Sequence, residues 1–273
     1  MSQLFQWLII RSTVLIKDKL HQVFSFPSYI LKAKTAHGVH SPFVFGLINE
    51  VLKNRTESDE LQSIEVERTK FLRNKSSIKR IDYGAGSSPA ITFQKFAARS
   101  LCSVKYCKML FRLAQYTKSM NALELGTALG ITTAYLSKSR ADIQIHTIEG
   151  DPTILNAAAE MWDGLDLKNV NSHLGSFDEM LPKILESSSP FDFVFVDGNH
   201  RKKPTLDYVE MIKSKLKENS VVIIDDIYWS REMTEAWTAL KMDETFSLSV
   251  DLFRMGLLFK RPGVEKQDFV LYF

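Results

Sequence analysis

Short apolar runs alternate with amphipathic stretches from Ser119 onward, and this alternation limits the folds that the chain can adopt. The apolar runs have the pattern of strands that are buried on both faces of a sheet. We predict five such strands, which cover residues 122–125, 143–148, 170–174, 191–196 and 221–224. Helices are predicted to begin near Thr132, Pro152, Phe177, Lys203 and Arg231. Strands that alternate with helices indicate a doubly wound α/β fold with a mostly parallel sheet.

Two β-rich runs follow the fifth predicted strand, at residues 246–250 and 255–259. Only a few residues separate them, which is typical of an antiparallel hairpin. We therefore expect a seven-stranded sheet that ends in an antiparallel terminal hairpin. Residues 268–273 offer a further edge strand, which the pattern does not place.

The residues before Ser119 have irregular helical patterns and an excess of basic side chains. Residues 1–118 carry 19 Lys and Arg against 8 Asp and Glu (+11), whereas residues 119–273 carry 16 against 24 (−8). We therefore divide the chain into a basic, mostly helical N-terminal cap, 1–118, and an α/β domain, 119–273. The basic charges are spread singly among apolar residues, as on solvated helix faces, so we expect no nucleic-acid partner and keep RNA binding as the alternative.

The apolar stretch at residues 4–16 lacks the features of a secretion signal or a membrane span. Gln6 and Arg11 interrupt it, no small-residue cleavage site follows, and it is too short to cross a bilayer. We expect an amphipathic helix that docks on the body or on a second copy in a homodimer, with a membrane-surface helix as the alternative. Cys102 and Cys107 provide neither a disulfide framework nor a zinc site, which fits a cytoplasmic setting.

A glycine-containing turn joins the first strand of the α/β domain to the next helix, from Glu124 to Thr132. Glycine lets the backbone approach a ligand, and a helix N-terminus offers unpaired N–H groups to an anionic group. The second strand ends at Glu149, whose carboxylate can accept hydrogen bonds from a ribose diol. The G-x-x-x-G spacing differs from the G-x-G-x-x-G of pyrophosphate sites.

The third predicted strand runs into a segment that suits an adenine ring. Phe177 offers an aromatic face, and Asp178 can accept a hydrogen bond from an amino group. A helix N-cap by Ser176 or Asp178, with Phe177 in the core, is the structural alternative. A second glycine turn, from Asp82 to Ser87, also looks like a cofactor loop, but we interpret it as a turn in the N-terminal cap.

Acidic side chains end the fourth and fifth predicted strands, at Asp197 and at the pair Asp225-Asp226. Because the carboxyl ends of neighbouring strands share one edge, three like charges would repel each other there unless a cation neutralises them. A divalent cation with oxygen ligands, such as Mg2+, meets this need. His200 can act as a general base, since neutral imidazole accepts a proton at physiological pH; capping of the following helix is the alternative.

The order of these motifs resembles the metal-dependent O-methyltransferases of the catechol and caffeoyl-CoA type. The resemblance rests on ELG-x-x-x-G-x-T, TIEGD, GSFDEMLP, FDFVFVDGNH and VVIIDD, and covers residues 105–261. It implies a class I, Rossmann-like methyltransferase that uses S-adenosyl-L-methionine and a small-molecule acceptor. The residues that it assigns to the methionine end of the cofactor are Glu124, Gly126, Gly130 and Thr132. It assigns the ribose to Glu149, the adenine to Phe177 and Asp178, and further cofactor contacts to Thr127, Ala128, Gly150, Ser176 and Asp197.

The resemblance also implies a metal site. Catechol-type enzymes use Asp, Asp and Asn as ligands, so the corresponding positions are Asp197, Asp225 and Asp226, with Asp226 in place of Asn. The macrolide-sugar O-methyltransferases have an acidic pair at the same place and a histidine base at the position of His200. The N-terminal motif from His37 to Phe43 resembles a bacterial group of class I methyltransferases.

Two other enzyme classes lack their signatures in this chain. A short-chain dehydrogenase needs a Tyr with a Lys four residues later, and none of the eight tyrosines has one. Base-amino methylation of nucleic acid normally requires an Asn/Asp-Pro-Pro-aromatic stretch after the fourth strand, where this chain has Asp-Gly-Asn-His. RNA ribose methylation and a non-catalytic cofactor-binding protein stay open as alternatives.

Overall fold

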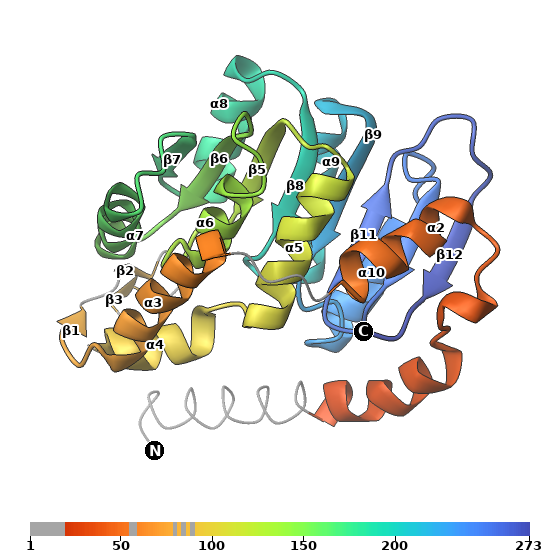
Figure 1. The fold of residues 1–273 in the computed structure, drawn as a ribbon, viewed down its shortest axis with the longest axis horizontal. Helices are drawn as coiled ribbons and strands as arrows, with labels where there is room; N and C mark the ends of the chain where they lie inside the picture. Colours follow the sequence, from red (N-terminus) through yellow and green to blue (C-terminus); the bar gives the residue numbers. More distant parts are fainter. Residues whose placement is uncertain (1–19, 55–58, 79–80, 83–85, 88–90) are drawn as a thin grey trace. The chain divides into compact units, whose positions relative to one another are not determined.

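The computed structural model describes residues 20–54, 59–78, 81–82, 86–87 and 91–273 (Figure 1). The predicted helix at residues 4–16 therefore lies outside the described residues. The chain divides into two compact units. The central unit consists of residues 40–195 and 215–220, and the terminal unit consists of residues 20–39, 196–214 and 221–273 of the described chain.

One eight-stranded sheet crosses the described chain, with the order β12-β10-β11-β9-β8-β5-β6-β7. The strands are β5 (Asn121–Leu125), β6 (Gln144–Glu149), β7 (Val170–Leu174), β8 (Phe191–Val196), β9 (Leu216–Ile224), β10 (Leu248–Asp251), β11 (Gly256–Phe259) and β12 (Gln267–Val270). β5, β6 and β7 are parallel, whereas β11 is antiparallel to both β9 and β10. The strand order reverses at β5, so the predicted doubly wound, mostly parallel sheet with its antiparallel hairpin is confirmed.

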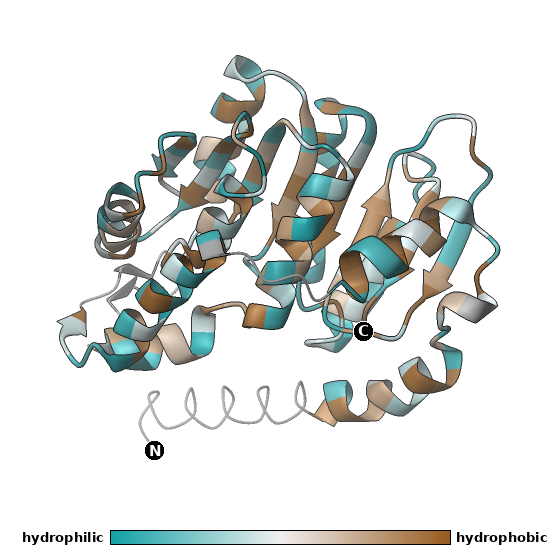
Figure 2. Ribbon diagram, viewed as in Figure 1, coloured by the Kyte–Doolittle hydropathy of each residue, from teal (hydrophilic) through white to brown (hydrophobic). Residues whose placement is uncertain are grey.

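The eighth strand, β12, overlaps residues 268–273, which the pattern offered as a further edge strand without placing it. It pairs in parallel with β10, with Leu248 opposite Gln267, at the edge of the sheet. None of its four residues is buried, which is also true of β7 at the opposite edge of the sheet. By contrast, β8 is hydrophobic along most of its length, as Figure 2 shows.

The helices α2, α4, α7 and α8 of the central unit begin at a residue whose side chain accepts a hydrogen bond from a backbone N–H of the first turn. Asp151 accepts from the N–H groups of Thr153 and Ile154 at the start of α7, and Ser176 accepts from Glu179 at the start of α8. The helices are α2 (Pro42–Gly46), the π-helix η2 (Leu47–Leu52), α3 (Asp59–Arg73), α4 (Phe93–Ser100), α5 (Val104–Tyr116), α6 (Ile131–Ser137), α7 (Pro152–Gly164) and α8 (Phe177–Ser187).

The N-terminal part of the central unit is mostly helical but also contains two small sheets. β1 (Ser77–Ile78) pairs with β4 (Ile91–Thr92), and β2 (Ile81–Asp82) pairs with β3 (Gly86–Ser87), each antiparallel. In the second of these pairs Asp82 lies opposite Gly86, and residues 83–85 of the second glycine turn lie outside the described residues.

A hydrophobic cluster joins this N-terminal part to the glycine turn after β5. Ile78, Phe96 and Ala97 pack with Leu129 of that turn and with Ile154 of α7. In the same unit α3 lies beside α4 and also contacts α6 (Figure 1). The N-terminal helices therefore support the turn that we expect to bind a cofactor.

The terminal unit combines both ends of the described chain. Residues 20–32 form a helix, followed by η1 (Ala36–Gly38), α9 (Lys202–Lys213) and α10 (Arg231–Met242). Tyr29 donates a hydrogen bond to the carbonyl of Leu271 at 2.5 Å, and Lys34 forms a parallel bridge with the same residue. Within the described residues, no helix has both the length and the apolar character needed to cross a membrane.

Candidate active site

The turn between β5 and α6 has a backbone that only a few residue types adopt easily. Gly126, Ala128 and Gly130 have φ values of 106°, 46° and 71°. The N–H groups of Gly126 and Thr127 both donate to the carbonyl of Ile148, which ties the turn to the end of β6. The turn is therefore held in one shape at the carboxyl end of the central strands.

Glu124 is the acidic residue of β5 and is completely buried. Thr133 and Thr147 donate hydrogen bonds to its Oε2 at 2.5 and 2.7 Å. Because Thr147 uses its only proton for Glu124, the 2.6 Å contact between the Thr127 and Thr147 hydroxyl groups has Thr127 as the donor. This network fixes the carboxylate of Glu124 beneath the glycine turn.

The other oxygen of Glu124, Oε1, is buried and has no hydrogen-bond partner in the described residues. Burial raises the pKa of this carboxyl group to about 7. A buried acceptor without a donor is costly for the fold, so its presence near the end of β5, next to the glycine turn, points to a ligand. The ammonium group at the methionine end of S-adenosylmethionine is a donor that matches it.

Glu149 ends β6 and is half-buried beside the same turn. Its Oε2 accepts from the backbone N–H of Ala128 at 2.9 Å, and its Oε1 accepts from that of Asp151 at 3.0 Å. Burial raises the pKa of Glu149, while these backbone hydrogen bonds lower it. Each carboxylate oxygen can accept a second hydrogen bond, so Glu149 fits the diol of a ribose.

The segment expected to hold an adenine follows β7 directly. The N–H of Gly175 donates to the carbonyl of Glu149 at 2.9 Å, which brings the segment to the end of β6. Ser176 caps α8, as the structural alternative proposed. Phe177 is half-buried and Asp178 is exposed, so neither is a core residue, and an adenine contact by either stays a prediction.

Two other predicted cofactor residues have distinct surroundings. Thr132 is buried on α6, with its hydroxyl oxygen 4.0 Å from the sulfur of Cys107. Gly150 is half-exposed between Glu149 and the cap of α7. Both lie in the central unit with the glycine turn, but no polar contact among the described residues assigns either of them to a ligand.

The ends of β8 and β9 meet in the terminal unit, as expected for neighbouring strands. The N–H of Asp225 donates to the carbonyl of Val196 at 3.0 Å. Asn199, with φ of 56°, donates to the hydroxyl of Tyr208 and so shapes the turn after β8. In that turn Nε2 of His200 lies 3.7 Å from Oδ1 of Asp197.

Asp225 is completely buried and paired with an arginine that our sequence interpretation missed. Nε of Arg254 donates to its Oδ1 at 3.0 Å, and Nη2 donates to its Oδ2 at 2.8 Å. Nε of Arg254 also lies 3.8 Å from Oδ1 of Asp226, whose φ is 54°. Burial and the charge of Asp225 raise the pKa of Asp226, while His200 and Arg254 act in the opposite direction.

This arrangement does not fit the divalent cation that we expected at Asp197, Asp225 and Asp226. Among the residues that the structure describes, no group of three or more His, Cys, Asp or Glu side chains is placed to hold a metal ion. The oxygens of Asp225 that would bind the cation face the guanidinium of Arg254 instead. The positive charge that neutralises these carboxylates thus comes from Arg254, in the turn between β10 and β11.

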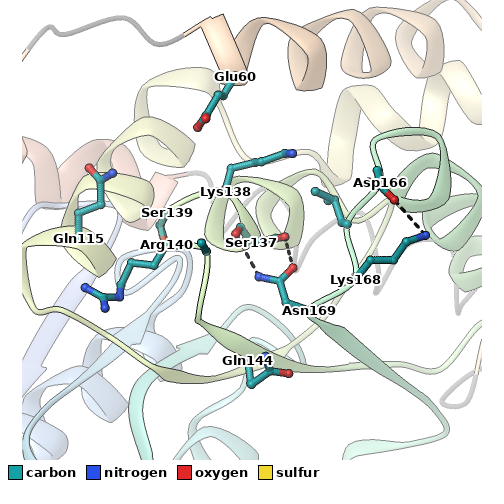
Figure 3. A pocket seen from close by; sticks show the side chains of 12 residues that line it. Glu60, Gln115, Ser137, Lys138, Ser139, Arg140, Gln144, Asp166, Lys168 and Asn169 are labelled. Atoms are coloured by element: carbon teal, nitrogen blue, oxygen red, sulfur yellow. Dashed lines mark hydrogen bonds and ion pairs between the residues drawn. The ribbon is translucent and has the colours of Figure 1, made fainter.

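A pocket of 620 Å³ lies at the opposite ends of the strands, near the amino ends of β6 and β7. Its cations are partly engaged, because Lys168 pairs with Asp166 and Arg140 pairs with Asp142. Ser137 and Asn169 bond to each other in its wall (Figure 3). Since Glu124 and Glu149 lie at the carboxyl ends of their strands, this pocket is separate from the predicted cofactor site.

Comparisons with known proteins show which families and folds this chain is similar to. A family model described as a methyltransferase domain matches residues 123–227. A catechol O-methyltransferase from Niastella koreensis is 28% identical over 123 residues, which are 44% of this chain and 55% of that protein. The O-methyltransferase ankF from Aspergillus thermomutatus is 28% identical over 144 residues, 50% of this chain and 58% of that protein. The chain thus spans little more than half the length of these relatives.

Solved structures show the same fold at lower sequence identity. The O-methyltransferase TomG from Streptomyces achromogenes, solved with SAM, has a TM-score of 0.55 and 18% identity, and the match covers 76% of this chain and 91% of TomG. The Podospora anserina methyltransferase PaMTH1, solved with SAH, has a TM-score of 0.58 and 17% identity, with 82% of this chain and 97% of PaMTH1 covered. Residues 123–227 are therefore a methyltransferase domain, within a chain that has the class I methyltransferase fold.

Proposed function

We propose that this chain transfers a methyl group from S-adenosyl-L-methionine to an oxygen atom of a small-molecule acceptor. The observation that carries the proposal is the buried Oε1 of Glu124, which has no partner among the described residues and lies beneath the glycine turn. The relatives named catechol O-methyltransferase and O-methyltransferase ankF support transfer to oxygen. The cofactor supplies a methyl group activated on a sulfonium ion.

The residues of the central unit bind and orient the cofactor in this proposal. Glu124 accepts from the ammonium group, and the first turn of α6 offers N–H groups to the carboxylate of the methionine end. Glu149 accepts from the ribose hydroxyl groups with the lone pairs that Ala128 and Asp151 leave free. Phe177 and Asp178 contact the adenine.

The acceptor's proton is removed by His200. Oδ1 of Asp197 lies 3.7 Å from Nε2 of this imidazole. A general base at this position raises the rate by about 10²–10⁴. Divalent metal assistance is not part of the proposal, because Asp225 is already bound to Arg254.

Two experiments test the proposal. Calorimetry should detect binding of S-adenosylmethionine and of its demethylated product, but not of NAD. Incubation with methyl-labelled S-adenosylmethionine and a panel of catechols, phenols and sugars should then yield a labelled product. Cofactor binding without turnover on any acceptor, RNA included, would favour the non-catalytic alternative, whereas labelling of RNA alone would favour ribose methylation. A cytoplasmic location and a homodimer stay predictions.

A further inference from the structure

Arg254 and Asp225 form a bidentate ion pair at the end of β9. Two parallel N–H···O bonds join a guanidinium to a carboxylate that is completely buried. Bidentate pairs of this kind are about twice as strong as neutral hydrogen bonds and fix the orientation of both groups. The same guanidinium also faces Asp226, so one cation serves both adjacent carboxylates.

The backbone register explains why an arginine reaches this place. β11 pairs with β9 so that Gly256 lies opposite Ile224. Two residues before Gly256, the chain is still aligned with the residues that follow β9, because the N–H of Ile227 donates to the carbonyl of Arg254 at 3.1 Å. Arg254 is therefore brought against Asp225 and Asp226 by the hairpin itself.

The turn that carries Arg254 is fixed by several further contacts. Phe253 adopts a φ of 67° and donates from its N–H to Oδ1 of the buried Asp251 at 2.8 Å. Its ring stacks on Tyr228, with centroids 5.1 Å apart, and the hydroxyl of Tyr228 donates to Oδ2 of Asp251 at 2.8 Å. The segment after β9 and the turn before β11 thus hold each other in one arrangement.

A divalent cation would have to compete with this arrangement. Mg2+ needs oxygen ligands at about 2.0–2.1 Å in a near-octahedral shell, and both oxygens of Asp225 are engaged with N–H groups. Displacing Arg254 would leave a guanidinium beside a doubly charged ion. The cation would therefore have to replace both hydrogen bonds of the Arg254–Asp225 pair.

We infer that Arg254 is a built-in positive charge that replaces the divalent cation at Asp225 and Asp226, so that methyl transfer by this chain is independent of metal. The inference rests on the proposed function for its catalytic part only. Arg254 acts as a positioning residue: it neutralises the carboxylate pair and holds the segment that leads to Tyr228.

The test compares metal binding with metal dependence. Wild-type protein is titrated with Mn2+, and binding is followed by the relaxation rate of water protons. Methyl transfer is then measured in excess chelator and in excess Mg2+. We expect no Mn2+ site tighter than about 1 mM, the weak end of protein Ca2+ sites, and equal rates in chelator and in Mg2+. A Mn2+ site at micromolar concentration that Asp225→Asn removes, or loss of transfer in chelator, would overturn the inference.

Variants of Arg254 separate its charge from its shape. Arg254→Gln should lower the rate at least about tenfold, and Arg254→Lys should retain more of it, because the ammonium keeps the charge but not the two parallel bonds. The control is Arg231→Gln, which removes an exposed arginine that pairs with Glu235 on the same helix. Wild-type activity in Arg254→Gln would refute the role. If no acceptor is found, or the Arg254→Gln protein does not fold, the Mn2+ titration of the wild type still decides the metal question.

Discussion

Trp162 donates a hydrogen bond from its indole nitrogen to the carbonyl of Gly130 at 2.9 Å, and its ring fills the space beside the Cα of that glycine. A Cβ at position 130 would lie 2.6 Å from the ring, and φ there is 71°. Both the turn's left-handed backbone and the packing of α7 therefore require glycine at the start of α6.

Gly130→Ala should destabilise the protein by about 1–3 kcal/mol and weaken cofactor binding, because the turn must shift to relieve the clash. Gly164→Ala is the matched control, since nothing lies within 4 Å of the Cβ that it would add. Urea unfolding measures the stability of both variants. Equal stability of Gly130→Ala and the wild type would show that the turn has another shape.

The stability of the ligand-free protein should fall as the pH rises from about 4.5 to about 7. The folded protein keeps the proton on Glu124 up to a pKa of about 7, whereas the unfolded chain releases it near 4.5. The folded state thus binds more protons in this window, and ionisation of Glu124 lowers stability by at most about 3 kcal/mol.

Glu124→Gln removes this titration, so its stability should depend less on pH across the same window. Urea unfolding at several pH values compares it with Glu160→Gln, which changes an exposed glutamate on α7. If the wild type and Glu124→Gln respond equally to pH, the buried carboxyl group is not the source of the pH dependence.

Glu149→Ala should weaken the binding of S-adenosylmethionine by about 1.5–3 kcal/mol, the value of a hydrogen bond to a charged group. The variant also frees the N–H groups of Ala128 and Asp151, so some loss of stability is expected. Glu149→Gln keeps one carbonyl acceptor, so its affinity for S-adenosylmethionine should lie between those of the wild type and Glu149→Ala. Calorimetry that finds unchanged affinity in Glu149→Ala would remove this residue from the ribose.

His200→Ala should slow methyl transfer by about 10²–10⁴-fold without lowering the affinity for the cofactor. The rate should recover in part at higher pH, where the acceptor loses its proton unaided. A pH profile of the rate on an acceptor found by screening measures this recovery. A variant whose rate and pH profile match the wild type would exclude His200 as the general base.

The sequence predicted the part of the fold that depends on local pattern. The strands β5, β6 and β8 to β11 contain buried apolar residues, and their runs are visible in the sequence. The strands β7 and β12 are edge strands with no buried residue, and the pattern offered β12 without placing it in the sheet. The glycine turn and Glu149 were also identified from local signals. The capping role of Ser176 could be proposed, but not separated from a role in binding, because both use the same side chain.

Two features of the site depend on pairing between distant residues and could not be predicted from pattern alone. Thr147 is 23 residues from Glu124, and only the parallel register of β5 and β6 brings their side chains together. Arg254 is 29 residues from Asp225. The hairpin was predicted, but its register was not. The sequence interpretation therefore assigned the positive charge that neutralises the carboxylates to a metal ion.

Calorimetric titration of the demethylated cofactor, S-adenosylhomocysteine, into the wild type and into Glu124→Gln tests the central claim most directly. We predict binding of one molecule per chain to the wild type, with affinity weaker by about 1.5–3 kcal/mol in Glu124→Gln, because the variant loses a charged acceptor for the ammonium group. Glu160→Gln should bind as the wild type does. Absence of binding to the wild type, or equal affinity in Glu124→Gln, would contradict the account.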